Sequence, residues 1–332
     1  MEKAVTLTWK PKVCLIVLNW MNYDLCSRLL RAFRDLTYSN LDVVLVDNGS
    51  PDGSGRRLSR DFPEIAYVAL RDNLGYAAGN NAGMKRALER GADLVFLLNF
   101  DLTILTCQII EHMVSCFQSI SELGILNPLI LLDSPSSGMS NRQFRRGLYF
   151  HVIQRMLVPE RGFRQTLKNG AILEERPFAH GSAMMISREC LERVGFLNEE
   201  FFMYMVEPEY CFRSRQNGFL TMVLLDEHAR VVHHVSITQK PLKTFFYARN
   251  QFLFLRLFSF CRQMLIFLVF FGSLVERTIH FIRKREPLSA LYHITGFCSG
   301  LRIWVKDLIG WSESGQYLLE EKIRFQRFRK RN

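Results

Sequence analysis

The 332-residue chain lacks several features that would assign it quickly to a protein class. Its eight cysteines are scattered and form no Cys-x-x-Cys pair, so we expect buried, reduced thiols of a cytosolic protein. Met1–Lys10 contains no apolar run long enough for a secretory signal, and we expect none. The sequence has neither a P-loop nor a Gly-x-Gly-x-x-Gly fingerprint, so it does not argue for ATP or NAD.

Long uncharged apolar runs are missing as well. The longest, Gln263–Val275, is shorter than the roughly 20 residues that a membrane-spanning helix needs. It belongs to a stretch rich in Phe and Leu, Phe245–Val275, which Arg249, Arg256 and Arg262 interrupt. Because arginines can lie at the level of lipid headgroups, we expect an interfacial helix or helical hairpin. A buried C-terminal helix of a soluble domain is the alternative.

Charge is present but unevenly distributed. The net charge is +11, and Lys322–Arg331 alone contributes six basic residues. Such a tail can meet nucleic acid, an anionic membrane surface or only water. No aromatic-lined single-strand motif or recognition helix accompanies it, so we expect no nucleic-acid partner.

In the first hundred residues, short apolar runs alternate with segments of helical periodicity. The expected strands are Val13–Leu18, Leu41–Val46, Ile65–Leu70 and Leu94–Leu98, and the expected helices are Leu25–Leu36, Gly55–Asp61 and Ala77–Arg90. Strands that alternate with helices predict a doubly wound, parallel α/β sheet. Further on, we expect strands at Phe178–Ser187, Met222–Leu225 and Arg230–Val232, and helices at Arg188–Val194 and Pro208–Asn217.

Polar residues follow three of the expected strands at their carboxyl ends. They are Asn19, the run Asp47-Asn48-Gly49-Ser50, and Asn99-Phe100-Asp101. In an open α/β sheet the ligand crevice lies outside the carboxyl ends of the strands, so the three clusters should converge there. This arrangement predicts a nucleotide-dependent site. A carboxylate such as Asp101 can bind a divalent cation that neutralises a diphosphate, although an Asp after a strand is often only a turn residue.

One of these clusters allows two interpretations, and a further segment of small and polar residues follows the expected strand Ile65–Leu70. The run Asp47–Ser50 could hydrogen-bond a base or ribose, or could simply form an Asx-turn. The segment from Asn73 to Gly83 opens a helix with small residues, which permit close approach of backbone to a ligand.

Taken in order, eight segments resemble one enzyme family. They are Val17–Trp20, Val46–Ser54, Asn73–Asn81, Leu97–Asp101, Gly181–Ile186, Gly195–Tyr204, Val232–Ser236 and Tyr247–Asn250. This series, covering about residues 12–250, resembles the family 2 glycosyltransferases, in particular the bacterial rhamnosyltransferase-like enzymes of surface polysaccharide assembly.

The resemblance implies a GT-A fold, a Rossmann-like and mostly parallel sheet with flanking helices, over residues 10–240. A C-terminal helical, membrane-associating region with the basic tail would follow at 241–332. The implied reaction is an inverting sugar transfer from a nucleotide-diphosphate sugar, assisted by Mg²⁺ or Mn²⁺. The implied acceptor is lipid-linked or a polysaccharide, and the implied location is the cytoplasmic face of the cell membrane.

The resemblance also assigns roles to individual residues. Asp47 would contact the nucleoside, and the remaining donor site would comprise Asn19, Asn48, Asn73, Gly75, Asn80 and Asn99. Asp101 would bind the metal at the last position of a DxD-type motif, with Asn99 at the first. His233 would complete the metal or diphosphate site, and an imidazole is a reasonable ligand there.

One departure from the family pattern concerns the general base. The family has a Glu-Asp pair after Phe-Phe-Met-Tyr, and here the two positions hold Val206 and Glu207. Glu207 keeps a carboxylate at the base position, one methylene longer than Asp. Glu209 is the alternative base, or else a charge that interacts with a helix N-terminus. Glu207 can act as the base if the backbone shifts to compensate, so we expect retained catalysis; altered acceptor choice and lost activity are the alternatives.

Two functional hypotheses therefore remain. The leading one is an enzyme of cell-envelope polysaccharide synthesis. The second is a non-catalytic glycosyltransferase-like protein that binds a sugar nucleotide or a partner enzyme, and only the Val206-Glu207 pair favours it. A soluble nucleotidyltransferase fits the α/β pattern but would need a Gly-rich, Lys-containing phosphate loop, which is not found.

Overall fold

The computed structural model describes residues 10–134, 138–140, 163–167, 170–234 and 240–308. The chain divides into two units. The first comprises Met1–Asn198 and Val206–Ile237, and the second comprises Glu199–Met205 and Thr238–Asn332. The second unit thus includes a short segment that interrupts the first one in sequence. The predicted basic tail, Lys322–Arg331, lies outside the described residues.

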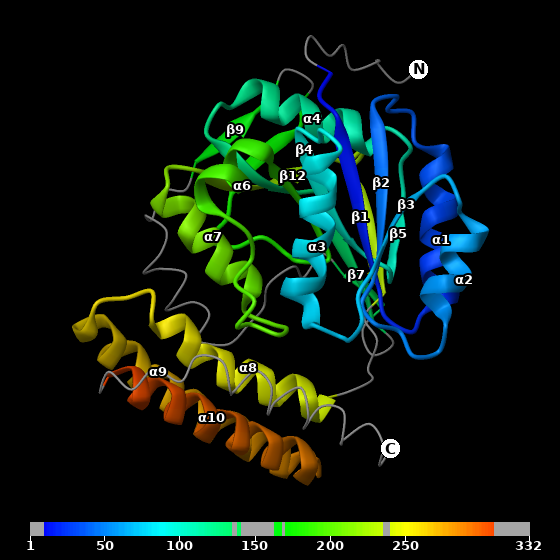
Figure 1. Cartoon of the computed structure of the whole chain (residues 1–332). Helices are drawn as coiled ribbons and strands as arrows, with labels where there is room; N and C mark the ends of the chain where they lie inside the picture. The colour runs from blue at the N-terminus through cyan, green and yellow to red at the C-terminus, as the bar shows by residue number, and fades with distance from the viewer. Residues whose placement is uncertain (1–9, 135–137, 141–162, 168–169, 235–239, 309–332) are drawn as a thin grey trace. The chain divides into compact units, whose positions relative to one another are not determined.

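The N-terminal half of the main sheet is parallel (Figure 1). It contains β1 (Val13–Asn19), β2 (Leu41–Asp47), β3 (Ala66–Ala69) and β4 (Leu94–Asn99), in the order β3-β2-β1-β4. These are the four predicted strands, so the predicted α/β arrangement is confirmed. β1 and β4 are buried along almost their whole length, as expected for parallel strands that are covered on both faces.

Beyond β4 the sheet becomes mixed. Its order continues β4-β11-β6-β12-β10-β9, formed by β11 (Ala183–Ser187), β6 (Leu123–Asn127), β12 (Leu220–Leu225), β10 (Ile172–Glu175) and β9 (Arg164–Thr166). β11 runs antiparallel to both β4 and β6. A second, four-stranded sheet contains β5 (Leu102–Ile104), β13 (Arg230–His234), β7 (Leu129–Ser134) and β8 (Gly138–Ser140).

Helices cover both faces of the main sheet. Alternate β1 residues, Val13, Leu15 and Val17, share one core cluster with residues of α1 (Tyr23–Ala32), α2 (Ser54–Asp61) and α4 (Ile109–Ser119). The other face packs against α3 (Gly75–Glu89), where a Cβ on Gly83 would lie 2.5 Å from a methyl of Ile16. Glycine therefore lets α3 approach the sheet closely.

Two further helices, α6 (Arg188–Val194) and α7 (Val206–Gln216), complete the first unit. α6 has the predicted bounds. α7 begins two residues before the predicted start at Pro208, which still places the proline in the first turn, where its missing N–H matters least.

The predicted strand Phe178–Ser187 is wrong in its first half, because β11 begins only at Ala183. The preceding residues form a loop in which the side chain of Asn127 bonds both backbone groups of His180. Asn127 accepts the N–H of His180 at 2.8 Å and donates to its carbonyl at 2.9 Å. A side-chain amide thus replaces the strand hydrogen bonds that the apolar sequence predicted.

The cysteine prediction is correct in part. All eight are free thiols, and Cys14, Cys26, Cys116, Cys190 and Cys211 are buried. Burial raises the pKa of Cys14 to about 12, which keeps it unreactive. Cys107, Cys261 and Cys298 are exposed, against the prediction.

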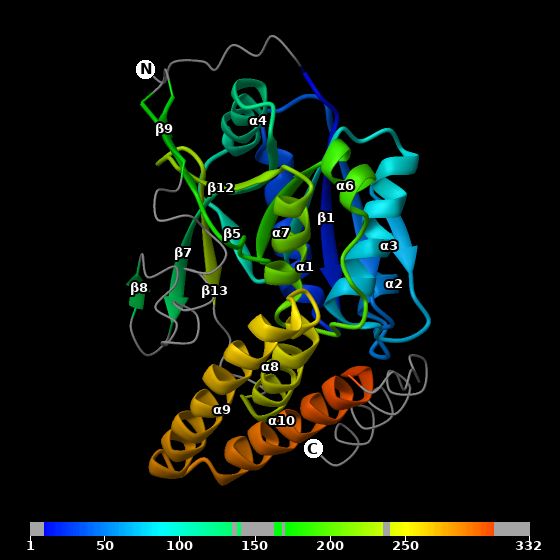
Figure 2. The same cartoon turned by 90° about the vertical axis from the view of Figure 1, so that its left-hand side faces the viewer.

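The described part of the second unit is built around three helices, α8 (Lys240–Leu255), α9 (Phe260–Arg283) and α10 (Pro287–Leu308) (Figure 2). α10 approaches α8 very closely, since a Cβ on Gly300 would lie 2.7 Å from the carbonyl oxygen of Arg249. Aromatic side chains such as Phe252, Phe270 and Phe297 fill the space between the helices. The predicted helix or hairpin is therefore part of a three-helix unit.

α9 presents an apolar surface. Among the described residues it is the one helix long and apolar enough to cross a membrane by length and composition, and only 11% of its most apolar window is buried. Its exposed apolar side chains are Phe260, Met264, Leu265, Leu268, Phe271, Val275, Ile279 and Ile282. Exposed apolar side chains in such numbers on one helix are uncommon on soluble monomers.

Candidate active site

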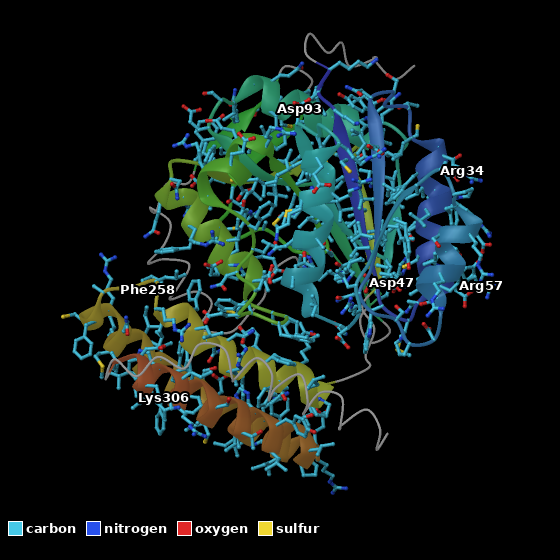
Figure 3. All side chains as sticks on the ribbon, in the orientation of Figure 1. Arg34, Asp47, Arg57, Asp93, Phe258 and Lys306 are labelled. Carbon is cyan, nitrogen blue, oxygen red and sulfur yellow. The ribbon has the colours of Figure 1, made fainter. Side chains whose placement is uncertain are left out.

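The carboxyl ends of β1, β2 and β4 meet at one edge of the main sheet. In the register, Asn19 lies opposite Asp47, and Leu18 lies opposite Asn99. Figure 3 labels Asp47 at this end and Asp93, which precedes β4, at the opposite end. The sheet thus brings together the polar residues that the sequence placed after separate strands.

Asp47 is held by a buried polar network. Asn19 is fully buried, and its Nδ2 lies 3.2 Å from Asp47 Oδ1 and 3.1 Å from the hydroxyl oxygens of both Ser50 and Ser54. A Cβ on Gly55 would lie 2.1 Å from Asp47 Oδ2, so only glycine leaves room for this carboxylate. Asn19 therefore acts on the site by fixing the position of Asp47.

Three of the other predicted donor residues shape the start of α3. Asn48 is buried, and its Nδ2 donates to Asn73 Oδ1 at 2.9 Å and to the Gly75 carbonyl at 3.1 Å. Asn48 Oδ1 accepts the N–H of Leu74 at 3.0 Å. Asn80 donates to the Tyr76 carbonyl within α3. These amides stabilise the turn and the helix that border the crevice.

Asp101 and His233 form a pair at the same edge. β13 runs antiparallel to β5, with His233 opposite Leu102, and this pairing brings His233 Nε2 within 3.3 Å of Asp101 Oδ2. Both side chains are largely buried. The remaining atoms, Asp101 Oδ1 and His233 Nδ1, are buried without a hydrogen-bond partner among the described residues.

A carboxylate oxygen and an imidazole nitrogen with unmet bonding capacity fit a divalent cation. Among the described residues, no group of three His, Cys, Asp or Glu side chains could hold a metal ion by itself. A cation at Asp101 and His233 would therefore need further ligands from a phosphate and from water, as is usual for Mg²⁺ in nucleotide sites.

His180 lies beside this pair and was missed in the sequence. Its ring packs edge-on against His233 with 5.4 Å between centroids, and its Nδ1 accepts the N–H of Ser182 at 3.2 Å. The expected strand Phe178–Ser187 placed His180 in its interior, away from the strand end where a crevice residue is expected. The segment Gly181–Ile186 belongs to the family resemblance, and His180 directly precedes it. This position was the signal that could have identified His180.

Glu207 meets the same loop. The residue is half-buried in the first turn of α7, and a Cβ on Gly181 would lie 1.8 Å from Glu207 Oε1. Tyr76 donates from its hydroxyl to the Gly181 carbonyl at 2.6 Å. Desolvation, and secondly the charge of Glu207, raise the pKa of Tyr76 well above its ordinary value, so the phenol stays a neutral donor.

Glu209 has a different environment. It is 3% exposed, and Arg213 binds both of its oxygens, with Nε–Oε1 at 2.6 Å and Nη2–Oε2 at 3.0 Å. Arg213 also donates to the carbonyls of Val194 and Phe196. A bidentate guanidinium stabilises the ionised carboxylate and occupies the oxygens that would take up a proton. Of the two candidate bases, this geometry favours Glu207.

Comparison with known proteins finds a family match over part of the chain. The family model of glycosyl transferase family 2 matches residues 13–119. The low-salt glycan biosynthesis hexosyltransferase Agl10 of Haloferax volcanii is 34% identical over 178 residues, which is 53% of this chain and 54% of that protein. The chain thus matches about half the length of this relative.

Two further relatives are matched over more of their length. The dTDP-rhamnosyl transferase RfbF of Shigella flexneri is 24% identical over 90% of this chain and 95% of its own. The N-acetylglucosaminyl-diphospho-decaprenol L-rhamnosyltransferase of Mycobacterium tuberculosis is 25% identical over 63% of this chain and 71% of its own.

Among solved structures, the mannosyltransferase PcManGT from Pyrobaculum calidifontis, in complex with GDP-Man and Mn²⁺, superposes with a TM-score of 0.54. The identity is 14%, over 89% of this chain and 88% of that one, so the similarity shows a shared fold. The predicted GT-A fold is thereby confirmed. The chain therefore carries a match to glycosyl transferase family 2 over residues 13–119, has the fold of a glycosyltransferase, and is similar in sequence to a hexosyltransferase and to rhamnosyltransferases.

Proposed function

We propose that this chain transfers a sugar, with inversion, from a nucleotide-diphosphate sugar to a lipid-linked or polysaccharide acceptor. The observation that carries the proposal is the loop His180–Ser182, which connects two chemical centres. At one end of this loop His180 packs on His233 of the Asp101 pair, and at Gly181 it contacts the Glu207 carboxylate. An ion-binding pair beside a carboxylate base is what a metal-assisted displacement needs.

The donor would lie along the crevice from Asp47 to Asp101. Asp47 would bind the nucleoside, and Asp101 and His233 would hold Mg²⁺ or Mn²⁺ beside the diphosphate. When bound, the cation neutralises charge on the departing nucleoside diphosphate. The complex of the mannosyltransferase neighbour with GDP-Man and Mn²⁺ supports this class of donor and metal.

Glu207 would act on the acceptor. Its carboxylate takes the proton of an acceptor hydroxyl while the hydroxyl oxygen attacks the anomeric carbon. The bond between that carbon and the diphosphate oxygen breaks, and its electron pair leaves with the nucleoside diphosphate. Attack from the face opposite the leaving group inverts the anomeric configuration.

A lipid-linked acceptor is supported by one relative and by one surface. The name of the mycobacterial relative specifies an acceptor sugar on diphospho-decaprenol. In the second unit, α9 exposes a row of large apolar side chains and ends at the exposed cations Arg283, Lys284 and Arg285. Apolar groups beside cations suit the surface of an anionic membrane, and we propose peripheral attachment at its inner face.

A donor screen tests the proposed function. Thermal unfolding of the full chain is measured with UDP-, dTDP- and GDP-sugars in the presence of Mn²⁺. A donor that binds only the folded state should raise Tm, since a concentration of 100 Kd stabilises by about 2.7 kcal/mol. We expect one nucleotide class to raise Tm with Mn²⁺ and to lose most of this effect with EDTA. No shift with any of these donors would contradict the donor assignment.

Membrane attachment gives a separate prediction. The full chain should co-sediment with vesicles that contain anionic lipid and should dissociate as salt rises, because each surface-proximal cation contributes about 1 kcal/mol that salt screens. Leu268→Glu with Phe271→Glu should abolish this binding, because both side chains are more than half exposed on α9. A chain that stays with membranes through high salt and alkaline carbonate would instead have a spanning helix.

Gly181→Ala tests the position of Glu207 without changing its chemistry. The new methyl group would overlap Glu207 Oε1, so the carboxylate must move while the fold persists, because the overlapping atom ends a flexible side chain. We expect kcat for sugar transfer to fall by about 10²-fold, as for a misplaced catalytic group, with donor Kd unchanged. Gly272→Ala is the control, because a Cβ there would meet no atom within 4 Å. Equal kcat in both variants would show that the position of Glu207 does not matter for the reaction.

A further inference from the structure

The segment that leads into Glu207 has an unusual backbone. Tyr204 and Met205 have φ values of 63° and 65°, in the left-handed region, and neither residue is glycine. Residues other than Gly, Asn and Asp rarely occupy this region, because the Cβ of their side chain crowds the following carbonyl group. Two such residues in succession persist only where surrounding contacts hold them.

Asn250 supplies the first of these contacts. It lies on α8, is fully buried, and donates from Nδ2 to the carbonyls of Met203 at 2.8 Å and Tyr204 at 2.9 Å. A side-chain amide has two N–H donors, and these two carbonyls use both. Asn250 thereby fixes the carbonyl groups immediately before and within the left-handed pair.

Arg249 supplies the second contact. It is 2% exposed, and its Nη1 donates to the Glu200 carbonyl at 3.2 Å and to Asn250 Oδ1 at 2.8 Å. The second of these bonds orients the Asn250 amide so that its N–H groups point at the segment. Arg249 therefore holds one end of the segment directly and the other end through Asn250.

The rest of the second unit reinforces this arrangement. Arg256 bonds both to Glu200 Oε2 at 2.7 Å and to Asp307 of α10 at 2.6 Å. Phe202 stacks on Phe246 with 5.1 Å between ring centroids. The segment Glu199–Met205 thus packs as a part of the C-terminal unit, and its backbone continues directly into Val206 and Glu207.

We propose that Arg249 and Asn250 are positioning residues for the general base. The inference rests on the proposed function of Glu207. Met205 is joined to Val206 by a peptide bond and Glu207 follows directly, so contacts that restrain the left-handed pair also restrain the chain that enters α7. The C-terminal unit then has a catalytic task, the alignment of the base, which is separate from membrane attachment.

Asn250→Asp tests this assignment. The variant keeps the shape of the side chain but replaces the two N–H donors by an oxygen that faces two carbonyl oxygens. We expect kcat to fall by about 10²-fold, with donor Kd within twofold of wild type. We also expect faster amide hydrogen exchange across residues 200–207, measured on the full chain without substrate.

Gln263→Leu is the matched control. Gln263 accepts a hydrogen bond from Trp304 Nε1 at 2.7 Å, so this variant also removes a side-chain hydrogen bond from the second unit. It should lower Tm while leaving kcat and exchange at residues 200–207 unchanged. Equal losses of kcat in the two variants would show general destabilisation and would overturn the positioning role.

A rescue variant separates positioning from folding. In the Asn250→Asp background, Tyr204→Gly removes the penalty of one left-handed residue and should recover at least several-fold of the lost kcat. Unchanged kcat and exchange in folded Asn250→Asp protein would refute the inference even if Glu207 is the base. If wild type transfers no sugar, the proposed function fails, and exchange at residues 200–207 alone decides whether Asn250 holds the segment.

Discussion

Glu207→Gln is expected to lower the rate of sugar transfer by about 10²–10⁴-fold, the usual contribution of a general base. Glutamine has nearly the same shape but cannot take up the proton of the acceptor hydroxyl. Donor affinity should stay nearly unchanged, because the base contacts the acceptor and not the diphosphate. The measurement is kcat for transfer, together with donor Kd from direct binding.

Two further variants sharpen this result. Glu209→Gln breaks the bidentate pair with Arg213. It should therefore lower Tm, with only a small effect on kcat. Glu207→Asp restores the family residue but retracts the carboxylate from Gly181. If Glu207→Gln transfers at the wild-type rate and Glu209→Gln does not, the base is Glu209. If neither change affects an active preparation, the proposed carboxylate-base mechanism is wrong.

Asp101→Asn should abolish metal-dependent turnover while leaving the fold intact. Asp101 Oδ1 is buried without a hydrogen-bond partner among the described residues, which suits a metal ligand, and burying an unpartnered oxygen costs stability while no metal is bound. The neutral amide should therefore leave Tm of the metal-free protein unchanged or higher. At limiting Mn²⁺, turnover should fall by more than the 10–100-fold typical of losing an outer-shell partner of a metal ligand.

Asp133→Asn is a matched control for this variant. Asp133 pairs with His234, the neighbour of His233, at 3.1 Å, but both side chains of that pair are about 40% exposed or more. The control should retain metal-dependent turnover. Turnover of Asp101→Asn that equals wild type at limiting metal would remove Asp101 from the metal site.

The parallel half of the fold could be predicted because its signals are local. β1 and β4 are unbroken apolar runs, and each ends in a polar residue at the sheet edge. The mixed half depends on long-range pairing that no short pattern encodes. Phe178–Ser182 has the composition of a strand, but its backbone groups bond distant side chains instead, those of His180 to Asn127, the N–H of Ala179 to Cys211 and the carbonyl of Gly181 to Tyr76.

The site was predictable in its composition more than in its geometry. Parallel register explains why Asn19, Asp47 and Asn99 meet, since each ends a strand of the same sheet. The pair Glu209–Arg213 has the i,i+4 spacing of a helical ion pair and could have been identified from sequence. The hold of Asn250 on the carbonyls of Met203 and Tyr204 could not, because it joins segments more than forty residues apart.

Release of nucleoside diphosphate by the full chain tests the central claim most directly. The donor is the nucleotide sugar that raises Tm, with Mn²⁺ and a lipid-linked diphospho-sugar acceptor present. An enzyme should release nucleoside diphosphate in proportion to protein and acceptor, and EDTA or Glu207→Gln should suppress this release. Donor binding with release no faster than in the absence of protein would contradict catalysis and would support the binding-only alternative.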